Sequence, residues 1–462
     1  MTKKSRYLTA AAVFVGASAL VLSGCSSSGG GSDDGDSVPA AESGEVTWWG
    51  YTPDTPVAER YIAEFNKEHP DIEVTYKNFE NVDYRTTLTP ALDSGEGPDV
   101  FVLSPAGGTP DLWGPYAIDL SSLAEDQLGA DWESKYGEGY VDQLRDSDGR
   151  LVSAPLGGMA AGYLWVDQDV LDEAGAEVPV DYDSWVDTCK AVAAIDKTCF
   201  TMGAGGADTF PSEMFHSIAN SVDPDFFIAA ATGEANWDDP AGVETLQIIS
   251  DMRDDGIIAP DALDGTQYPL ANEQFMKGDA AMVQMGFWYT QYSGAESCKA
   301  SMEAAGVSDP TCFTQLPAAF PDVAGKGNGS EYFGEADYGL AINADSPNIG
   351  AAKTFVSWMS MTEAGQQNVA NALDLIPALQ GVAPDWSSIS LVDDAVQRPA
   401  IEQLITDSSS TTQTRQYQTS EATLDAIVLA IQRVLDPTSD ASIDEIAAEL
   451  QDSAEPSDVG SD

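Results

Sequence analysis

Short apolar segments alternate along this chain with segments whose apolar residues recur at helical spacing, and this alternation limits the possible folds most. After the first 45 residues, the order is strand, helix, strand, helix, strand. Such an order predicts a parallel sheet with helices over both faces. In the first expected helix, Thr55 precedes Pro56, which predicts an N-cap followed by a first helical residue. The expected strands lie at 46–49, 72–76 and 99–103, and the expected helices at 55–69 and 84–93.

The same alternation continues through the rest of the chain, and we find no internal repeat. A chain of 462 residues with 43% hydrophobic residues can build more than one core. The pattern therefore predicts an α/β protein with several domains or one two-lobed unit. The further expected strands lie at 151–154, 162–166, 199–202, 280–285 and 338–342, and the further helices at 183–195, 211–220, 243–253 and 347–361.

The charge balance excludes some classes of partner. The chain carries 76 Asp and Glu against 20 Lys and Arg, a formal net charge of −56. Nucleic acids and anionic membrane surfaces both require clustered basic side chains, so we expect neither as a partner. The acidic residues are interpreted as a solvated, soluble surface.

The amino terminus predicts export and a lipid anchor. Lys3, Lys4 and Arg6 precede an apolar run at 7–22, which is shorter than the roughly 20 residues of a stable membrane span. The run ends in Leu-Ser-Gly-Cys25, which resembles a lipobox. We expect a signal peptide at 1–24, a diacylglycerol on Cys25 and anchoring to the outer face of the cytoplasmic membrane. The alternative is an ordinary secretion signal with an incidental cysteine.

The segment at 26–45 has no aromatic residue and no apolar period. This composition predicts a disordered tether. A flexible linker of this length reaches roughly 25 Å, which lifts a domain off the membrane and keeps it nearby. A second disordered segment, acidic and without caps, is expected at 451–462.

The other four cysteines fall into two local pairs, Cys189 with Cys199 and Cys298 with Cys312. An even number at short separations outside the cytoplasm predicts disulfides. No two of them show the close spacing of zinc ligands, so we expect no metal site and no cofactor.

Five segments in a fixed order carry a resemblance to a known family. They are VTWW with EFNKEHPDIEV (46–49 and 64–74), LDSGEGPDVF (92–101), GRLVSAPLGGMAAGYLWVDQDVLDEAG (149–175), FMKGDAAMVQMGFWY (275–289), and YGLAINADSPNIGAAKTFVSWM (338–359) with LIPA at 375–378. Together they resemble family 1 of the extracellular solute-binding proteins of ABC importers, the maltose-binding-protein-like group. One departure is Trp165-Val166-Asp167, where the family usually has Tyr-Asn-Lys, and no role is transferred from that motif.

The resemblance implies a two-lobed periplasmic-binding-protein-like fold of type II, with two parallel or mixed sheets flanked by helices and joined by a hinge. The N-terminal lobe would comprise 46–157 and about 337–387, and the C-terminal lobe about 158–336 and about 388–450. The implied function is a monomeric receptor that is not an enzyme. It would close around a carbohydrate and deliver it to the permease of an ABC transporter.

A sugar ring presents a face of C–H bonds and a rim of hydroxyls, so its site needs aromatic planes and hydrogen-bonding groups. Strand ends and nearby loops supply the candidates, since α/β sheets place ligands there. Because strand residues alternate faces, we expect one of Trp48 and Trp49 in the core and the other in the cleft. Trp288 matches the sugar-stacking position of the family. The candidate ligand-binding residues are Trp48, Trp49, Tyr51, Glu80, Asp83, Ser104, Asp208, Phe210, Trp288, Tyr289, Arg415 and Tyr417.

Two other functions remain open at this point. A receptor of the same fold could bind a polyamine or another cationic solute through aromatic rings and carboxylates. A secreted glycosidase would need two carboxylates roughly 5–10 Å apart across a cleft. The chain has no G-x-S-x-G and no H-E-x-x-H pattern, and Gly203-Ala204-Gly205-Gly206 lacks the ending of a phosphate-binding loop.

Overall fold

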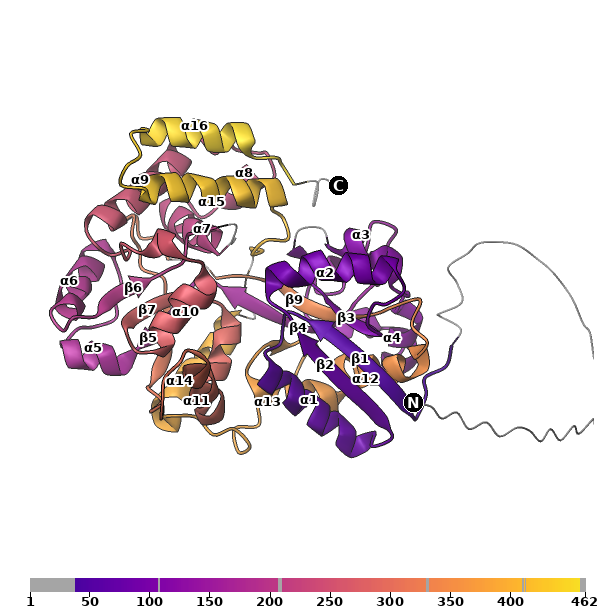
Figure 1. Ribbon diagram of the computed structural model, residues 1–462. Helices are drawn as coiled ribbons and strands as arrows, with labels where there is room; N and C mark the ends of the chain where they lie inside the picture. The colour runs from indigo at the N-terminus through magenta and orange to yellow at the C-terminus, as the bar shows by residue number, and fades with distance from the viewer. Residues whose placement is uncertain are drawn as a thin grey trace, which may run out of the picture.

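The computed structural model describes residues 38–106, 109–206, 210–329, 332–408, 411 and 413–457. Two lobes, each built on its own sheet, lie side by side (Figure 1). This arrangement confirms the two-lobed α/β fold. The expected signal peptide, the lipidation site Cys25 and most of the tether lie outside the described residues, as does Asp208.

The N-terminal lobe holds a six-stranded sheet in the order β10-β4-β9-β3-β1-β2. β1 pairs in parallel with β2 and β3, whereas β9 is antiparallel to β3 and β4. The strands are β1 Gly44–Gly50, β2 Ile72–Asn78, β3 Val100–Leu103, β4 Ala154–Ala161, β9 Phe333–Ile342 and β10 Ile376–Pro377. The helices are α1 Thr55–Glu68, α2 Asn81–Asp93, α3 Thr109–Trp113, α4 Ser121–Leu128, α12 Ile349–Met361 and α13 Glu363–Ala372.

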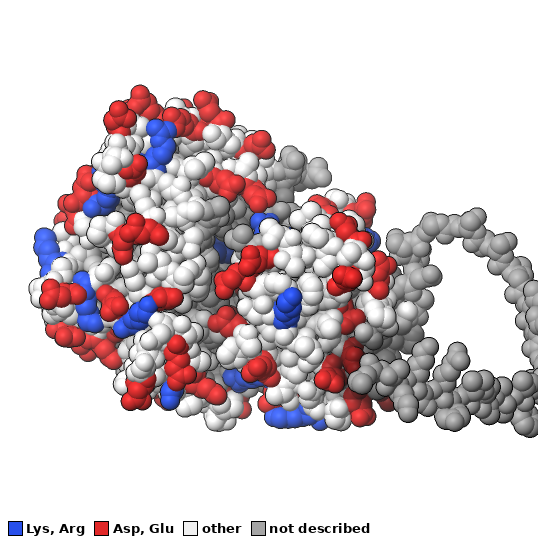
Figure 2. All heavy atoms as spheres, in the orientation of Figure 1, with Lys and Arg blue, Asp and Glu red and all other residues white. Residues whose placement is uncertain are grey.

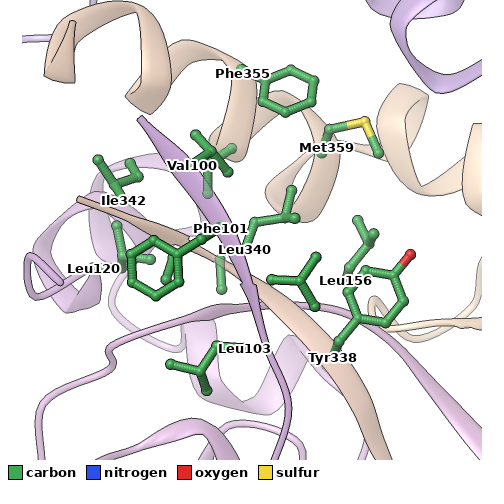
Figure 3. Close-up of a cluster of buried hydrophobic side chains, with 14 of the residues drawn as sticks. Val100, Phe101, Leu103, Leu120, Leu156, Tyr338, Leu340, Ile342, Phe355 and Met359 are labelled. Atoms are coloured by element: carbon green, nitrogen blue, oxygen red, sulfur yellow. The ribbon is translucent and has the colours of Figure 1, made fainter. Parts of the chain in front are cut away.

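The core of this lobe forms because β3 is apolar along its whole length and lies between β1 and β9. All four of its residues are buried. α1 and α12 cover one face of the sheet, where Phe355 packs against Phe65 and Trp48. Figure 3 shows side chains of β3 and β9 packed with Phe355 and Met359 of α12.

The C-terminal lobe holds a four-stranded mixed sheet in the order β6-β7-β5-β8. β6 and β7 are parallel, and β5 is antiparallel to β7 and β8. The strands are β5 Tyr163–Asp167, β6 Thr198–Thr201, β7 Ala280–Met285 and β8 Gln315–Ala319. The helices are α5 Gln168–Ala174, α6 Tyr182–Ala193, α7 Pro211–Val222, α8 Phe226–Ala231, α9 Pro240–Asp254, α10 Asn272–Met276, α11 Ala295–Ala304, α14 Asp394–Ser408, α15 Glu421–Leu435 and α16 Ile443–Ser453.

β4 and β9 run from one lobe into the other. In β4, Leu156 belongs to the core of the N-terminal lobe and Met159 to a core of the C-terminal lobe. In β9, the same change occurs between Phe333 and Ala336. The chain therefore crosses between the lobes on two strands that pair with each other, and it crosses a third time between β10 and α14.

Gly157 and Gly158 lie inside β4, at shifts in its register with β9. A side chain at Gly158 would meet the Tyr140 hydroxyl at 1.7 Å, and one at Gly157 would meet Leu375 at 2.6 Å. Glycine is needed here because other groups approach the crossing strand closely.

Two expected boundaries differ from the structure. Thr55 is the first residue of α1, and Asp54 holds the N-cap position without a side-chain cap. The C-terminal tail was expected to be disordered from residue 451, but α16 continues through Ser453, and the Ser457 N–H donates to the Ala231 carbonyl at 2.9 Å. Leu450 is buried against the core, and a capping box of Ser442 and Glu445 starts the helix, which explains its length.

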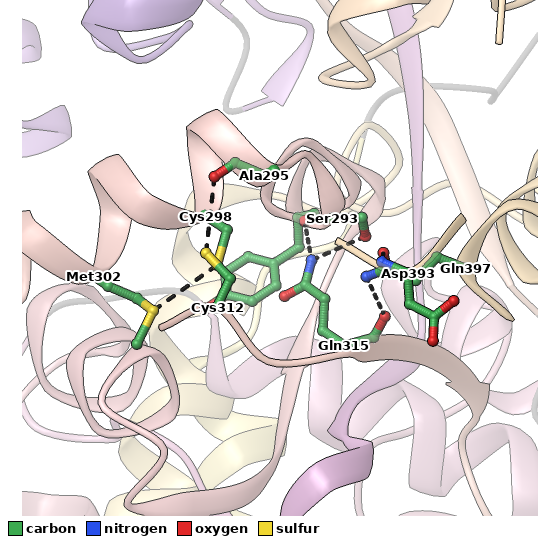
Figure 4. Close-up of a disulfide and its surroundings, with 9 residues drawn as sticks. Ser293, Ala295, Cys298, Met302, Cys312, Gln315, Asp393 and Gln397 are labelled. Carbon is green, nitrogen blue, oxygen red and sulfur yellow. Dashed lines mark hydrogen bonds between the residues drawn. A yellow bond between two sulfur atoms is a disulfide. The ribbon is translucent and has the colours of Figure 1, made fainter. Parts of the chain in front are cut away.

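Both expected disulfides are confirmed. Cys189–Cys199 links α6 to β6, and Cys298–Cys312 links α11 to the segment before β8 (Figure 4). Each bridge closes a short loop, with sequence separations of 10 and 14 residues. Loops of this size correspond to about 2–4 kcal/mol of stabilisation each. Acidic side chains are spread over the visible face of both lobes, with only scattered Lys and Arg (Figure 2).

His216 on α7 lies between two aromatic rings in the core of the C-terminal lobe. Its ring centroid is 3.7 Å from that of Phe227 and 4.1 Å from that of Phe333. Burial lowers the pKa of His216 to about 3, although a hydrogen bond to Gln413 opposes this shift. The imidazole is therefore neutral in the folded protein.

This neutral histidine predicts acid sensitivity. Below pH 6.5 the unfolded chain binds a proton at His216 that the folded chain does not bind until about pH 3, so stability falls as the pH falls through this window. Between pH 7 and pH 5, the protonation of His216 in the unfolded chain is expected to lower the free energy of unfolding by about 2 kcal/mol. Urea unfolding of the wild type and of His216→Gln at both pH values measures this contribution. Equal pH dependence of the two proteins would contradict the prediction.

Candidate functional site

The carboxyl ends of β1 and β3 place Tyr51 and Ser104 close together. β1 and β3 are neighbours in the sheet and run parallel, so their ends meet at the same edge. Burial raises the pKa of Tyr51 to about 12, the negative charge of Asp337 adds to the shift, and the neighbouring Ser104 hydroxyl opposes it. Tyr51 is therefore a neutral hydrogen-bonding group on the N-terminal side of the site.

β9 brings two carboxyl groups to the same place. Ala336 and Tyr338 pack into the core of the N-terminal lobe, so Glu335 and Asp337 project from the other face of the strand. Glu335 is buried, and one of its oxygens accepts the backbone N–H groups of Gln416 at 2.9 Å and Tyr417 at 2.8 Å.

Asp337 is half-buried and has a shifted pKa. Burial raises the pKa of Asp337 to about 7; the Arg415 guanidinium counteracts this shift, and the charges of Glu335 and Glu213 reinforce it. Asp337 therefore lies within electrostatic reach of groups from both lobes.

The C-terminal lobe contributes a set of aromatic rings around Arg415. The guanidinium carbon lies 5.1 Å from the ring centroid of Trp288 and 5.5 Å from that of Phe210. Arg415 Nε donates to a carboxylate oxygen of Glu213 at 2.6 Å, and a second guanidinium nitrogen pairs with the same oxygen. Burial lowers the pKa of Arg415, but the charges of Glu213, Glu335 and Asp337 and the hydrogen bond to Glu213 together outweigh it, so the pKa is raised and the group stays cationic.

Trp288 is half-buried, and its position depends on Gly286 at the end of β7. A side chain at Gly286 would meet the indole ring at 2.0 Å, so glycine lets the ring lie against the strand end. The indole N–H donates to the Tyr268 hydroxyl at 3.1 Å, and Phe210 packs edge-on at 6.0 Å. One indole face is thus held in a fixed orientation at the edge of the lobe.

The side chains described so far in this section form one group, which we call the cleft cluster, and its members come from both lobes. Figure 2 shows the surface hollowed where the two lobes meet. The cleft cluster consists of Tyr51, Ser104, Phe210, Glu213, Tyr268, Trp288, Glu335, Asp337 and Arg415.

Polar contacts between the lobes flank the cleft cluster. The Tyr292 hydroxyl donates to Asp54 at 2.6 Å, and Arg85 pairs with Glu421 at 3.1 Å. Gln291 donates from one amide nitrogen to the Trp288 carbonyl at 3.0 Å and to Asp374 at 3.2 Å. This last contact connects the loop that carries Trp288 to the N-terminal lobe.

The structure places two of the expected site residues, Trp48 and Tyr289, in the core. Trp48 is fully buried and packs on Tyr76 at 4.4 Å, whereas its neighbour Trp49 is half-buried beside Phe79 and Lys77. Tyr289 is also fully buried, and its hydroxyl donates to Asn272 at 2.8 Å.

The other expected residues divide into two groups. Tyr51, Ser104, Phe210, Trp288 and Arg415 lie in the cleft cluster, and the Tyr417 backbone contacts it through Glu335. Glu80 and Asp83 are exposed at the start of α2, with no contact to the cluster among the described side chains. Asp208 lies outside the described residues.

Sequence reasoning missed Glu213, Tyr268, Glu335 and Asp337. A signal existed for two of them, since the acids at 335 and 337 alternate with residues that are buried in an otherwise apolar strand. The expected strand began at 338 and excluded them. Glu213 and Tyr268 give no comparable signal, because only the fold brings them next to Arg415 and Trp288.

The described part of the chain contains no helix with the length and apolar character of a membrane span. Within the same residues, no three His, Cys, Asp or Glu side chains group in a way that could hold a metal ion.

The chain is similar to known proteins at several levels. The family model described as bacterial extracellular solute-binding protein matches residues 49–366. An uncharacterised ABC transporter extracellular-binding protein of Pyrococcus horikoshii is 23% identical over 234 residues. That match covers 50% of this chain and 53% of the relative, so it spans about half of that protein's length.

Solved structures share the fold at low identity. A chitin oligosaccharide binding protein aligns with a TM-score of 0.68 at 18% identity, covering 89% of this chain and 98% of that one. The GacH receptor of Streptomyces glaucescens, solved unliganded and with acarbose, aligns with a TM-score of 0.66 at 22% identity, with coverages of 89% and 97%. A sugar transporter from Arthrobacter chlorophenolicus with bound laminaribiose aligns at 0.64 and 16% identity, with coverages of 88% and 98%. The family match over most of its length means that this chain belongs to the bacterial extracellular solute-binding proteins.

Proposed function

We propose that this protein is the carbohydrate receptor of an ABC importer, binding an oligosaccharide between its lobes and delivering it to the permease by hinge closure. The observation that carries the proposal is the half-buried indole of Trp288, held in place by Tyr268, Phe210 and Gly286 beside polar groups of both lobes. An aromatic face suits the C–H face of a sugar, and convergent polar groups suit its hydroxyls. The similar structures with bound oligosaccharides support the same class of ligand.

The crossing strands supply the hinge. β4 and β9 carry the chain between the cores at closely approached glycines. We infer that the lobes rotate about this crossing and that contacts such as Tyr292 to Asp54 are made in the closed form. A ligand drives closure only through contacts that it makes better in that form.

The amino-terminal signals complete the proposal. Cleavage before Cys25 and acylation of its thiol would tether a monomeric receptor to the outer face of the cytoplasmic membrane, within reach of its permease. Metabolic labelling with a radioactive fatty acid would follow this modification, with Cys25→Ser as the unlabelled control.

A thermal-shift screen tests the function. Maltotriose, cellotriose, xylotriose and laminaritriose are added to the mature protein, and a ligand at 100 times its Kd is expected to stabilise the fold by about 2.7 kcal/mol. Spermidine serves as the cationic non-sugar control. A shift with spermidine alone would contradict the carbohydrate proposal, and new reducing ends after incubation would indicate a glycosidase instead.

A further inference from the structure

The charges of the cleft cluster do not balance. Glu213, Glu335 and Asp337 are three carboxyl groups, and Arg415 is the one cation placed among them by the described residues. Glu213 is paired with Arg415, and Glu335 is held by the backbone N–H groups of Gln416 and Tyr417. These two carboxylates are thus already compensated.

Asp337 has no such compensation. The described residues supply it with neither a hydrogen bond nor an ion pair, and the Arg415 guanidinium, which is hydrogen-bonded to Glu213, acts on it only electrostatically. A second carboxyl group, Asp374, interacts electrostatically with Asp337 and is itself 2% exposed, with one oxygen that lacks a hydrogen-bond partner. Removing a carboxylate partly from water costs free energy unless a cation or hydrogen-bond donors lie beside it.

Arg415 is the cation that acts on Asp337, and the phenols near this carboxyl group add no positive charge to it. Tyr51 and Tyr140 both lie within its electrostatic reach, and burial, followed by the charge of Asp337, raises the pKa of each phenol to about 12. Both phenols therefore stay neutral. Arg85 also acts on Tyr51, but it is paired with Glu421. Aromatic rings combined with a free carboxylate are the surroundings that favour an ammonium group.

We propose that the oligosaccharide taken by this cleft carries a protonated amine and that Asp337 is the counter-ion of that amine. The inference rests on the carbohydrate function proposed above and names its substrate class as an amino-sugar oligosaccharide. An ammonium stabilises the ionised form of Asp337, whereas a hydroxyl brings no positive charge, so a neutral sugar binds less tightly than its amine-bearing counterpart.

Two matched pairs of probes test the inference. Chitosan trisaccharide differs from cellotriose by an ammonium in place of the 2-hydroxyl of each ring, and 6-amino-6-deoxymaltotriose differs from maltotriose at the 6-position. Isothermal titration calorimetry of the full mature protein measures Kd for all four. In at least one pair, the amine-bearing sugar is expected to bind at least 10-fold more tightly than its neutral partner.

The variant Asp337→Asn assigns the effect to one residue. It is expected to lose the amine preference, so that each amine-bearing sugar binds no more tightly than its neutral partner. Asp183→Asn, which removes one exposed negative charge at the start of α6, is expected to keep it. Because Asp337→Asn removes an uncompensated charge, the unliganded variant is also expected to have a higher Tm than the wild type, and this holds without any ligand.

Each outcome is decisive. Neutral sugars that bind as tightly as their amines would overturn the inference and leave the carbohydrate function standing. Binding by none of the four would overturn the inference, and if no sugar of the thermal-shift screen binds either, the carbohydrate function falls with it. An amine preference that survives in Asp337→Asn, or a lower Tm for that variant, would overturn the role of Asp337.

Discussion

Trp288→Ala is expected to weaken oligosaccharide binding about 10–100-fold while leaving the fold intact. Covering a large apolar side chain contributes about 1.5–3 kcal/mol, and about 1.4 kcal/mol corresponds to a tenfold change in Kd. The indole is half-buried, so its removal opens no sealed cavity in the core. Calorimetric titration with the best ligand from the thermal-shift screen gives the change in Kd.

The matched control is Trp386→Ala. Trp386 is also partly buried, but it packs against Leu373, Leu391 and Ile401, with Arg398 at 5.8 Å from its ring, and it is not part of the cleft cluster. This variant is expected to bind as the wild type does. Equal losses in the two variants would indicate a general effect on stability and not a stacking role for Trp288.

Arg415→Met is expected to lower the free energy of unfolding by about 3–5 kcal/mol, because it leaves Glu213 charged and buried without its partner. The Glu213 side chain is 3% exposed and that of Arg415 is 13% exposed, so water can do little to replace the lost interaction. Urea unfolding at pH 7 measures the loss.

The double variant Arg415→Met with Glu213→Gln distinguishes the effect of an unpaired charge from the effect of lost packing. Removing both charges is expected to restore most of the lost stability, since a buried ion pair is often close to neutral relative to uncharged residues. A double variant as unstable as Arg415→Met would show that the loss comes from packing against Trp288 and Phe210 and not from the charge of Glu213.

The elements with strong local signals could be predicted from the sequence. The five segments at the start of the domain all appear as expected in type, because each has a clear period and its own stop signal. The two disulfides followed from the even number and short separations of the cysteines together with the expected location outside the cytoplasm. The end of α16 shows where the same reasoning fell short. The acidic composition after Leu450 suggested disorder from residue 451, but the capping box at the start of the helix and the burial of Leu450 in the core stabilise the helix through Ser453.

The site could be predicted only in part, because membership in it depends on which way a side chain points. Alternation along β1 predicted that one of Trp48 and Trp49 would be buried, but not which one. Trp48 is in the core because its face of the sheet packs on α12. The convergence of Glu213, Asp337 and Arg415 comes from segments far apart in the chain, so no local pattern could reveal it.

The separation of β3 from β9 along the chain also predicts an order in which the two sheets can pair. The strands β5, β6, β7 and β8 lie within one continuous stretch of chain, so the C-terminal sheet can pair as soon as that stretch is available. β3 must wait for β9, more than two hundred residues later, before its second edge is covered. A newly exported chain therefore holds an exposed apolar strand until residues 333–342 emerge, and during this interval it is most open to aggregation and to capture by chaperones.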